Sequence, residues 1–114
     1  MHLALAAISA RPLAEAAARE GFNAIALDLF GDRDTCRAAS EWLPIGAPEA
    51  LRIDATKLLD ALSTLARRGD VRGWVAGAGF DGCADLLEQG AARLPLLGGY
   101  IANARAARAK DGGP

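Results

Sequence analysis

The chain has 114 residues, which suits one domain with one hydrophobic core and excludes a second domain with a core of its own. Hydrophobic residues make up 52% of the chain and the net charge is −1, with acidic and basic residues interspersed. This composition argues against a disordered tail and against a nucleic-acid partner. No apolar run approaches the ~20 residues that span a bilayer, so we expect a cytoplasmic protein without membrane contact.

The first part of the chain predicts a strand, a helix and a second strand. Leu3–Ile8 is a short continuous apolar run, the form of a strand that is covered on both faces. Pro12 suits the first turn of a helix, and Gly21 suits the position just after its end. Asn23–Asp28 then predicts the second strand.

The middle of the chain predicts a capped short helix, a weak strand and a long amphipathic helix. Asp32 or Asp34 can cap a short helix that runs through Ala39, and a weak third strand is expected at Trp42–Gly46. The next helix has Asp54 as its N-cap, Gly69 after its end and one apolar face, formed by Leu58, Leu62 and Leu65.

The last elements continue the alternation of strand and helix. Val71–Ala76 predicts a strand, Asp81–Gln89 a helix that closes at Gly90, and Leu94–Leu97 a final strand. Pro95 favours an edge position for that strand. Such alternation with short connections predicts an α/β fold: a three-layer, Rossmann-like open parallel sheet of four to five strands with helices on both faces.

With the common strand order 3-2-1-4-5, the ligand crevice would lie beyond the ends of the first and fourth strands. The turn after the first strand holds Ser9 and Arg11. Ser9 could donate a hydrogen bond to a ligand or simply cap the helix. Arg11 lies beside a helix N-terminus and could bind a carboxylate or phosphate; the alternative is an ion pair with Asp28 or Asp32.

The acidic residues after the second strand border the same crevice. We expect Asp28 to face the functional rim, while capping is the main expected role of Asp32, which stays a candidate for ligand contact. The turn GAGFDG, residues 77–82, contributes Gly77, Gly79 and Phe80. Phe80 would form a pocket wall or, as we favour, a core or domain contact.

GAGFDG satisfies the dinucleotide pattern GxGxxG, but the acidic residue expected about 20 positions later is absent. Structural glycines in a tight turn are therefore favoured over NAD or FAD binding. His2 is the single histidine and lies at the start of the chain, and Cys36 and Cys83 are isolated. We therefore assign no catalytic residue, no metal site and no disulfide.

Three stretches resemble the N-terminal segment of predicted ATP-grasp carboxylate–amine ligases, particularly a subgroup linked to tetrahydromethanopterin-dependent one-carbon metabolism. They are ALAAISARPLAEAAAREGFNAIALDLFGDRDT, VAGAGFDG and LPLLGG…AKDGGP. The matching features are the Ser-Ala-Arg turn, the strand that ends in Asp-Leu-Phe and the Gly-Ala-Gly-Phe-Asp turn. The resemblance covers most of the chain up to about Leu97.

The resemblance implies a Rossmann-like pre-ATP-grasp domain at residues 1–98 and a helical tail, or a junction to an ATP-grasp domain, at residues 99–114. In the full-length family the ATP-grasp domain supplies the ATP and magnesium sites. For this chain it implies a substrate-side, structural role without catalysis of its own, with an ATP-grasp domain as partner in cis or in trans. The alternatives are a stand-alone module that binds a small molecule or nucleotide, and a domain that forms homodimers.

Overall fold

The computed structural model describes residues 1–98, so the predicted tail or junction at residues 99–114 lies outside the described part of the chain. In chain order the elements are β1 (His2–Ala6), α1 (Arg11–Arg19), β2 (Asn23–Asp28), α2 (Arg33–Ala38), β3 (Glu41–Pro44), β4 (Gly46–Ala47), a 3-10 turn (Pro48–Ala50), β5 (Arg52–Ile53), α3 (Ala55–Arg68), β6 (Val71–Ala76), α4 (Ala84–Arg93) and β7 (Leu96–Gly98).

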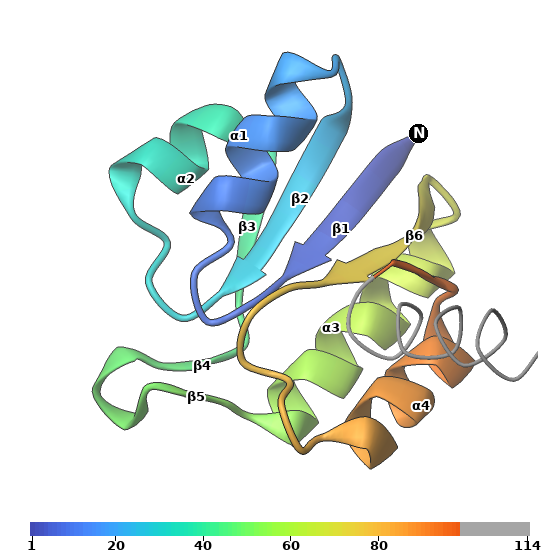
Figure 1. Ribbon diagram of the computed structural model, residues 1–114. Coiled ribbons are helices and arrows are strands. Elements are labelled where there is room, and N and C mark those ends of the chain that lie inside the picture. The colour runs from blue at the N-terminus through green and yellow to red at the C-terminus, as the bar shows by residue number, and fades with distance from the viewer. Residues whose placement is uncertain (99–114) are drawn as a thin grey trace, which may run out of the picture.

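The main sheet contains five parallel strands in the order β3-β2-β1-β6-β7. This is the predicted order, with β1 in the centre (Figure 1). Leu5 of β1 is in register with Ala26 of β2 on one side and with Val75 of β6 on the other. β4 and β5 form a separate antiparallel ribbon that follows β3. The predicted Rossmann-like open sheet is confirmed.

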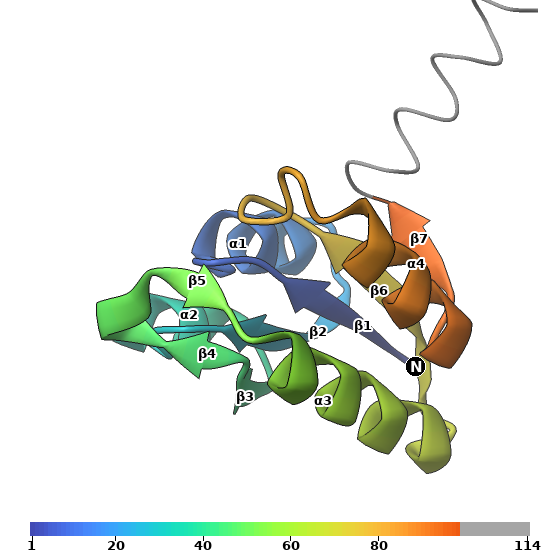
Figure 2. The ribbon, with the colours of Figure 1, turned by 90° about the horizontal axis from the view of Figure 1, so that it is seen from below.

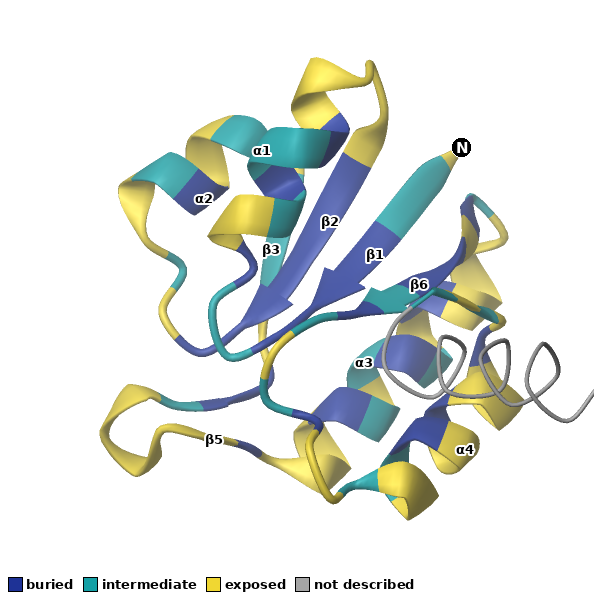
Figure 3. Ribbon diagram, in the orientation of Figure 1, coloured by how far each residue is buried: buried dark blue, intermediate teal, exposed yellow. Residues whose placement is uncertain are grey.

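The sheet is the middle of three layers. Helices α1 and α2 cover one face, and α3 and α4 cover the other (Figures 1 and 2). Every strand-to-strand connection within the parallel sheet has to cross a face, because neighbouring strands run in the same direction. The helices are these crossovers, and together they leave the strands of the middle layer largely buried (Figure 3).

The two faces of the sheet carry side chains of different size. The face beneath α1 is lined mainly by alanine, from both the helix and the strands: Ala10, Ala14, Ala17, Ala24 and Ala26. The opposite face carries large side chains, among them Ile25, Leu27, Trp74, Leu58 and Leu62. Side chains alternate between faces along a strand, so Ala24 and Ala26 face α1 while Ile25 and Leu27 face α3. The alanine content of the sequence thus lets α1 lie close to the sheet.

Several predicted helix ends are present. Oδ1 of Asp32 accepts a hydrogen bond of 2.8 Å from the Thr35 N–H, and Oδ1 of Asp54 accepts one of 2.9 Å from the Lys57 N–H. Each carboxylate therefore caps its helix. Gly69 ends α3 in the left-handed region, with φ of 79°.

The C-terminal elements differ from the prediction. Helix α4 begins at Ala84 rather than Asp81 and continues past Gly90 to Arg93. Gly90 lets α4 pack closely against Trp74 of β6, since a Cβ at this position would lie 2.6 Å from Cζ2 of Trp74. β7 begins at Leu96, two residues later than predicted.

The segment after β2 also differs from the prediction. β3 covers Glu41–Pro44 rather than Trp42–Gly46. The β4–β5 ribbon was not predicted. Its 3-10 turn is followed by Leu51, whose φ of 49° is the only positive value at a non-glycine residue in 1–98. Over the same range, no helix combines the length and the hydropathy required to cross a bilayer.

Candidate functional site

The turns after β1, β2 and β6 meet at the carboxyl edge of the sheet and are hydrogen-bonded to one another. The Ile8 N–H donates to the Ala78 carbonyl at 2.9 Å, and the Leu29 N–H donates to the Ile8 carbonyl at 3.2 Å. The predicted convergence of these turns is confirmed. We call them the carboxyl-edge turns: residues 7–10, 29–32 and 77–83.

Asp28 lies at this edge but is 0% exposed. Its Oδ2 accepts a hydrogen bond of 2.9 Å from the Ala10 N–H. Its Oδ1 accepts three more, from the Phe30 N–H at 3.1 Å, the Gly31 N–H at 2.9 Å and the Trp42 Nε1–H at 2.7 Å. The predicted rim role is therefore corrected: the carboxylate binds groups of its own chain and ties β2 to the start of α1 and to β3.

Arg11 is exposed and lies between two carboxylates. Its Nη2 is 3.1 Å from Oδ2 of Asp34, and its Nε is 3.4 Å from Oε2 of Glu15. The charge of Asp34, followed by the hydrogen bond to Glu15, raises the pKa of Arg11. The expected ion pair is present, but the predicted partners were wrong, because Asp28 is buried and Asp32 caps α2.

The hydrogen bond from the Thr35 N–H lowers the pKa of Asp32. The carboxylate of Asp32 therefore caps α2, and this capping bond accounts for its position.

Ser9 does not cap α1, which was one of its two predicted roles. The N-cap residue is Ala10, and no side chain caps this helix. The carboxylate of Asp28 takes the Ala10 N–H instead, and Pro12 has no N–H. Only two of the four free donors that usually begin a helix therefore remain at the start of α1. This weakens the predicted anion site beside Arg11.

The glycine turn is packed against β1. The Gly77 N–H donates to the Ala6 carbonyl at 2.7 Å, and a Cβ at Gly77 would lie 2.8 Å from Cδ1 of Leu13. Gly79 has φ of +113°, and a Cβ there would lie 2.6 Å from Cγ1 of Ile8. These contacts support the interpretation of GAGFDG as a structural turn: Gly77 leaves room for Leu13 of α1, and Gly79 leaves room for Ile8 in the turn after β1.

Phe80 is a core residue rather than a pocket wall. Its side chain is buried, and its ring centroid lies 5.8 Å from that of Trp74 at an interplanar angle of 58°. This tilted arrangement is favourable for two aromatic rings. The core contact was the favoured prediction, and it anchors the end of the glycine turn in the larger of the two hydrophobic clusters.

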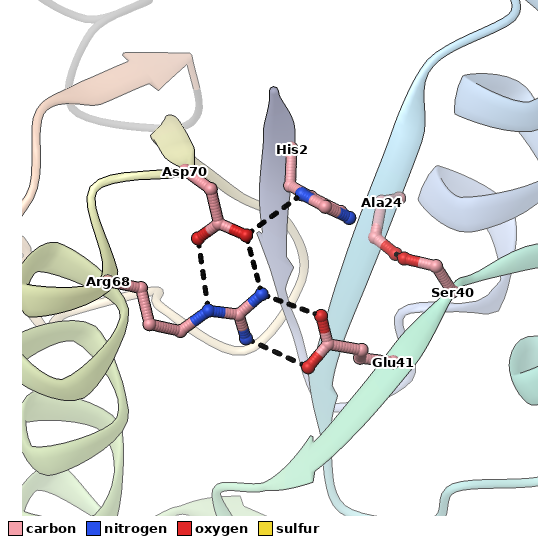
Figure 4. Close-up of polar contacts among 6 residues, drawn as sticks. All are labelled: His2, Ala24, Ser40, Glu41, Arg68 and Asp70. Atoms are coloured by element: carbon pink, nitrogen blue, oxygen red, sulfur yellow. Dashed lines mark hydrogen bonds and ion pairs between the residues drawn. The ribbon is translucent and has the colours of Figure 1, made fainter.

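A second polar cluster, which the sequence did not predict, lies at the amino edge of the sheet and is centred on Arg68 (Figure 4). Two guanidinium nitrogens of Arg68 donate to the two carboxylate oxygens of Glu41, each at 2.8 Å. Nε and Nη2 of Arg68 donate to Asp70 at 3.0 and 2.8 Å. Nδ1 of His2 lies 3.5 Å from Oδ2 of Asp70. In the sequence, Arg68 is recognisable only as one of two cations in the last turn of α3.

The Arg68 cluster joins elements that are far apart in the chain. Its residues come from the starts of β1 and β3, from the end of α3 and from the connection between α3 and β6 (Figure 4). Hydrogen bonds from Arg68 lower the pKa values of Glu41 and Asp70, and the two carboxylates raise the pKa of Arg68. The cluster can stabilise the amino edge of the sheet. It is an ion pair network in which Arg68 donates to both carboxylates.

A surface groove of about 320 Å³ lies between β3 and α3. It is lined by Leu43, Pro44, Lys57, Asp60, Ala61 and Thr64. None of these residues was predicted as a site residue. Leu43 and Pro44 were placed in the weak third strand, and Lys57, Asp60 and Thr64 lie in the predicted long helix without any role assigned to them.

Residues 1–98 contain no group of three or more His, Cys, Asp and Glu side chains that could hold a metal ion. Comparison with family models, with curated proteins and with solved structures finds no match to this chain. The structure alone establishes the fold class, an α/β protein with a five-stranded parallel sheet.

Proposed function

We propose that this chain is a pre-ATP-grasp-like domain that supports the substrate side of a carboxylate–amine ligase and has no catalysis of its own. One observation carries the proposal. The Ser-Ala-Arg, Asp-Leu-Phe and Gly-Ala-Gly-Phe turns, which carry the sequence resemblance, lie at one edge of a Rossmann-like sheet and are hydrogen-bonded to each other.

The hydrogen bonds within the carboxyl edge favour a role in supporting another domain over independent ligand binding. The Asp28 carboxylate and the backbone groups of Ile8, Ala10 and Ala78 already have partners within the chain. A stand-alone binding site usually offers convergent polar groups that are free to meet the ligand. Here the bonds instead hold three turns in fixed positions, which suits a platform for another domain.

Two exposed side chains near the carboxyl edge could meet a partner domain or substrate, although Arg11 would have to exchange its ion pairs with Asp34 and Glu15 to do so. Phe30 follows β2 and is 42% exposed, and the Arg11 side chain is 49% exposed. Exposed aromatic and arginine side chains are common anchors at interfaces. We propose that Phe30 packs against an ATP-grasp domain, in cis or in trans, and that Arg11 faces the substrate carboxylate.

ATP and magnesium chemistry would belong to the ATP-grasp domain. No residue among 1–98 is assigned to either ligand, and the role of this chain is to shape the cleft beside it. We therefore expect the purified chain to release no phosphate from ATP with magnesium, and its melting temperature to stay unchanged. ATP hydrolysis that is lost in the variant Arg11→Ala would overturn the proposal in favour of a stand-alone nucleotide-binding protein.

The partner can be tested directly. We expect the coding sequence after codon 114 to continue in frame into a segment with Lys, Glu and Asp at ATP-grasp spacings. Calorimetric titration of that segment with residues 1–114 should show binding that Phe30→Ser weakens about tenfold, as loss of an aromatic anchor does. Phe22→Ser is the matched control, because Phe22 is 50% exposed but precedes β2. Equal binding by both variants contradicts the proposed contact.

A further inference from the structure

The outer edge of the main sheet is formed by β3. Within residues 1–98 no strand pairs with the outer side of β3, since β2 is its single neighbour in the sheet. An open strand edge presents unpaired backbone N–H and C=O groups, which can pair with another chain. β3 is only four residues long and contains Pro44, so strand pairing alone would give a small contact.

The groove beside this edge adds an apolar surface to it. Leu43 and Pro44 form one wall and Ala61 the other, with Lys57, Asp60 and Thr64 along the rim from α3. Ala61 and Thr64 are short side chains, which let a neighbouring helix approach α3 closely. We call the outer edge of β3 with these residues the β3–α3 surface.

The walls of the groove are held at both ends. At one end, Arg68 of α3 binds Glu41 of β3 through two hydrogen bonds of 2.8 Å. At the other, the Asp54 N–H, just before α3, donates to the carbonyl of Ile45, just after β3, at 2.8 Å. A surface that is already rigid loses little conformational entropy when a partner binds.

The rim of the groove carries one cation and one anion without ion-pair partners. Lys57 and Asp60 are three residues apart on α3 and are exposed. Neither side chain takes part in an ion pair with any residue among 1–98. The exposed stripe of α3 therefore has a positive and a negative group at neighbouring positions, both available to an opposite charge.

We propose that the β3–α3 surface is the interface between two copies of this chain, related by a two-fold axis. In such an interface the same patch lies on both subunits, so it has to be complementary to itself. A strand edge can pair with its own copy in the antiparallel direction. The same axis sets the two α3 helices antiparallel, and the proposed dimer places Lys57 of each copy opposite Asp60 of the other. This surface is separate from the carboxyl-edge turns, so the inference does not depend on the proposed function.

The size of the surface predicts a dimer that dissociates on dilution. The four residues of β3 extend over about 13 Å, and the 14 residues of α3 over about 21 Å. A footprint of these dimensions falls at the lower end of specific protein interfaces. Exposed ion pairs at its rim make the association weaker as salt is added.

Sedimentation equilibrium of the full chain over a wide concentration range tests the proposal. The unmodified protein should show a monomer–dimer equilibrium. Lys57→Asp places two aspartates opposite two aspartates in the homodimer, and Asp60→Lys places two lysines opposite two lysines. Each variant alone should raise the dimer dissociation constant at least about tenfold, as like charges at an interface do.

An equal mixture of the two variants gives the sharpest test. In a heterodimer of Lys57→Asp with Asp60→Lys, both charge contacts are opposite in sign again, so the mixture should dimerise about as well as the unmodified protein. This recovery also shows that both variants fold. Glu20→Lys, after α1 on the other side of the sheet, is the control and should leave the dimer unchanged.

Three results would overturn the proposal. One is a monomer at every concentration of the unmodified protein, which would leave the groove to a different ligand or partner. Another is a dimer that both charge variants retain, which would place the interface elsewhere. The last is a mixture of the two variants that stays as weak as each variant alone, since only a contact between Lys57 and Asp60 across the axis predicts its recovery.

Discussion

The buried carboxylate of Asp28, at the end of β2, accepts a hydrogen bond of 2.7 Å from the indole Nε1–H of Trp42 on β3. The same oxygen accepts two backbone N–H groups, and the other oxygen accepts the N–H of Ala10. One side chain thus satisfies donors from three segments. Its energetic role follows from the high cost of leaving a buried donor without an acceptor.

Asp28→Ala should lower the free energy of unfolding by about 3–5 kcal/mol, because four donors lose their acceptor. Trp42→Phe removes one donor and leaves the other three bonds, so it should cost about 1–2 kcal/mol. Urea unfolding of both variants measures the difference. An Asp28→Ala protein as stable as Trp42→Phe would show that Asp28 does not organise this edge.

Gly79→Ala and Gly82→Ala separate backbone strain from packing within one turn. Both glycines have positive φ, but a Cβ at Gly79 would meet Ile8, whereas a Cβ at Gly82 would have nothing within 4 Å. Gly82→Ala should therefore cost about 1–2 kcal/mol, the strain of the left-handed region alone. Gly79→Ala should cost at least about 1 kcal/mol more, because the turn would have to move away from Ile8. Equal losses in thermal or urea unfolding would contradict the tight packing of this turn.

The small side chains beneath α1 predict a strong dependence on side-chain volume. Ala14 is 0% exposed between α1 and the sheet, so Ala14→Leu should destabilise the protein by about 1–3 kcal/mol through overpacking. Ala18, on the exposed side of the same helix, is the matched control, and Ala18→Leu should change stability by less than about 0.5 kcal/mol. Urea unfolding compares the two, and a tolerated Ala14→Leu would mean that α1 can shift outward.

The Arg68 cluster predicts a loss of stability in acid. Glu41 and Asp70 have lower pKa values in the folded protein than their usual values of about 4.3 and 3.9. Their contribution is therefore fully present above about pH 5 and is lost as the pH falls through the folded values. Arg68→Met should remove this contribution, so the stability gap to the unmodified protein should be largest near neutral pH.

Urea midpoints at neutral and acidic pH test this expectation. The gap between Arg68→Met and the unmodified protein should close at acidic pH. Arg67→Met is the control, because Arg67 lies in the same helical turn and makes one hydrogen bond, of 3.4 Å, to Thr64. A gap of the same size at both pH values would mean that Arg68 stabilises through packing rather than through its carboxylates.

The sequence predicted those features that local chemistry decides. The caps at Asp32 and Asp54 depend on side chains that reach a backbone N–H three residues away. The parallel sheet followed from alternating elements and short connections, and the common strand order taken for it placed the three turns at one edge correctly.

The errors arise where contacts between distant residues override local preference. Ser9 is a good cap by composition, but Asp28, 18 residues away from Ala10, takes the N–H at that helix start. Gly90 resembles a helix end, but it lies inside α4 because Trp74 fills the space of a side chain. The groove depends on Leu43 and Ala61, whose proximity no periodicity in the sequence indicates.

The hydrogen bonds from Arg68 to Glu41 also affect how the protein unfolds locally. The two residues are 27 positions apart and connect the end of α3 to the first residue of the edge strand. An edge strand would normally fray alone, and its amides would then exchange with solvent far faster than those of the core. Here β3 cannot separate from the sheet without breaking its contact with α3, the helix that borders it on one face. Amide exchange of β3 should therefore be slow, near the rate set by global unfolding. It should become faster in Arg68→Met, which would show that this one guanidinium couples the local unfolding of β3 to that of α3.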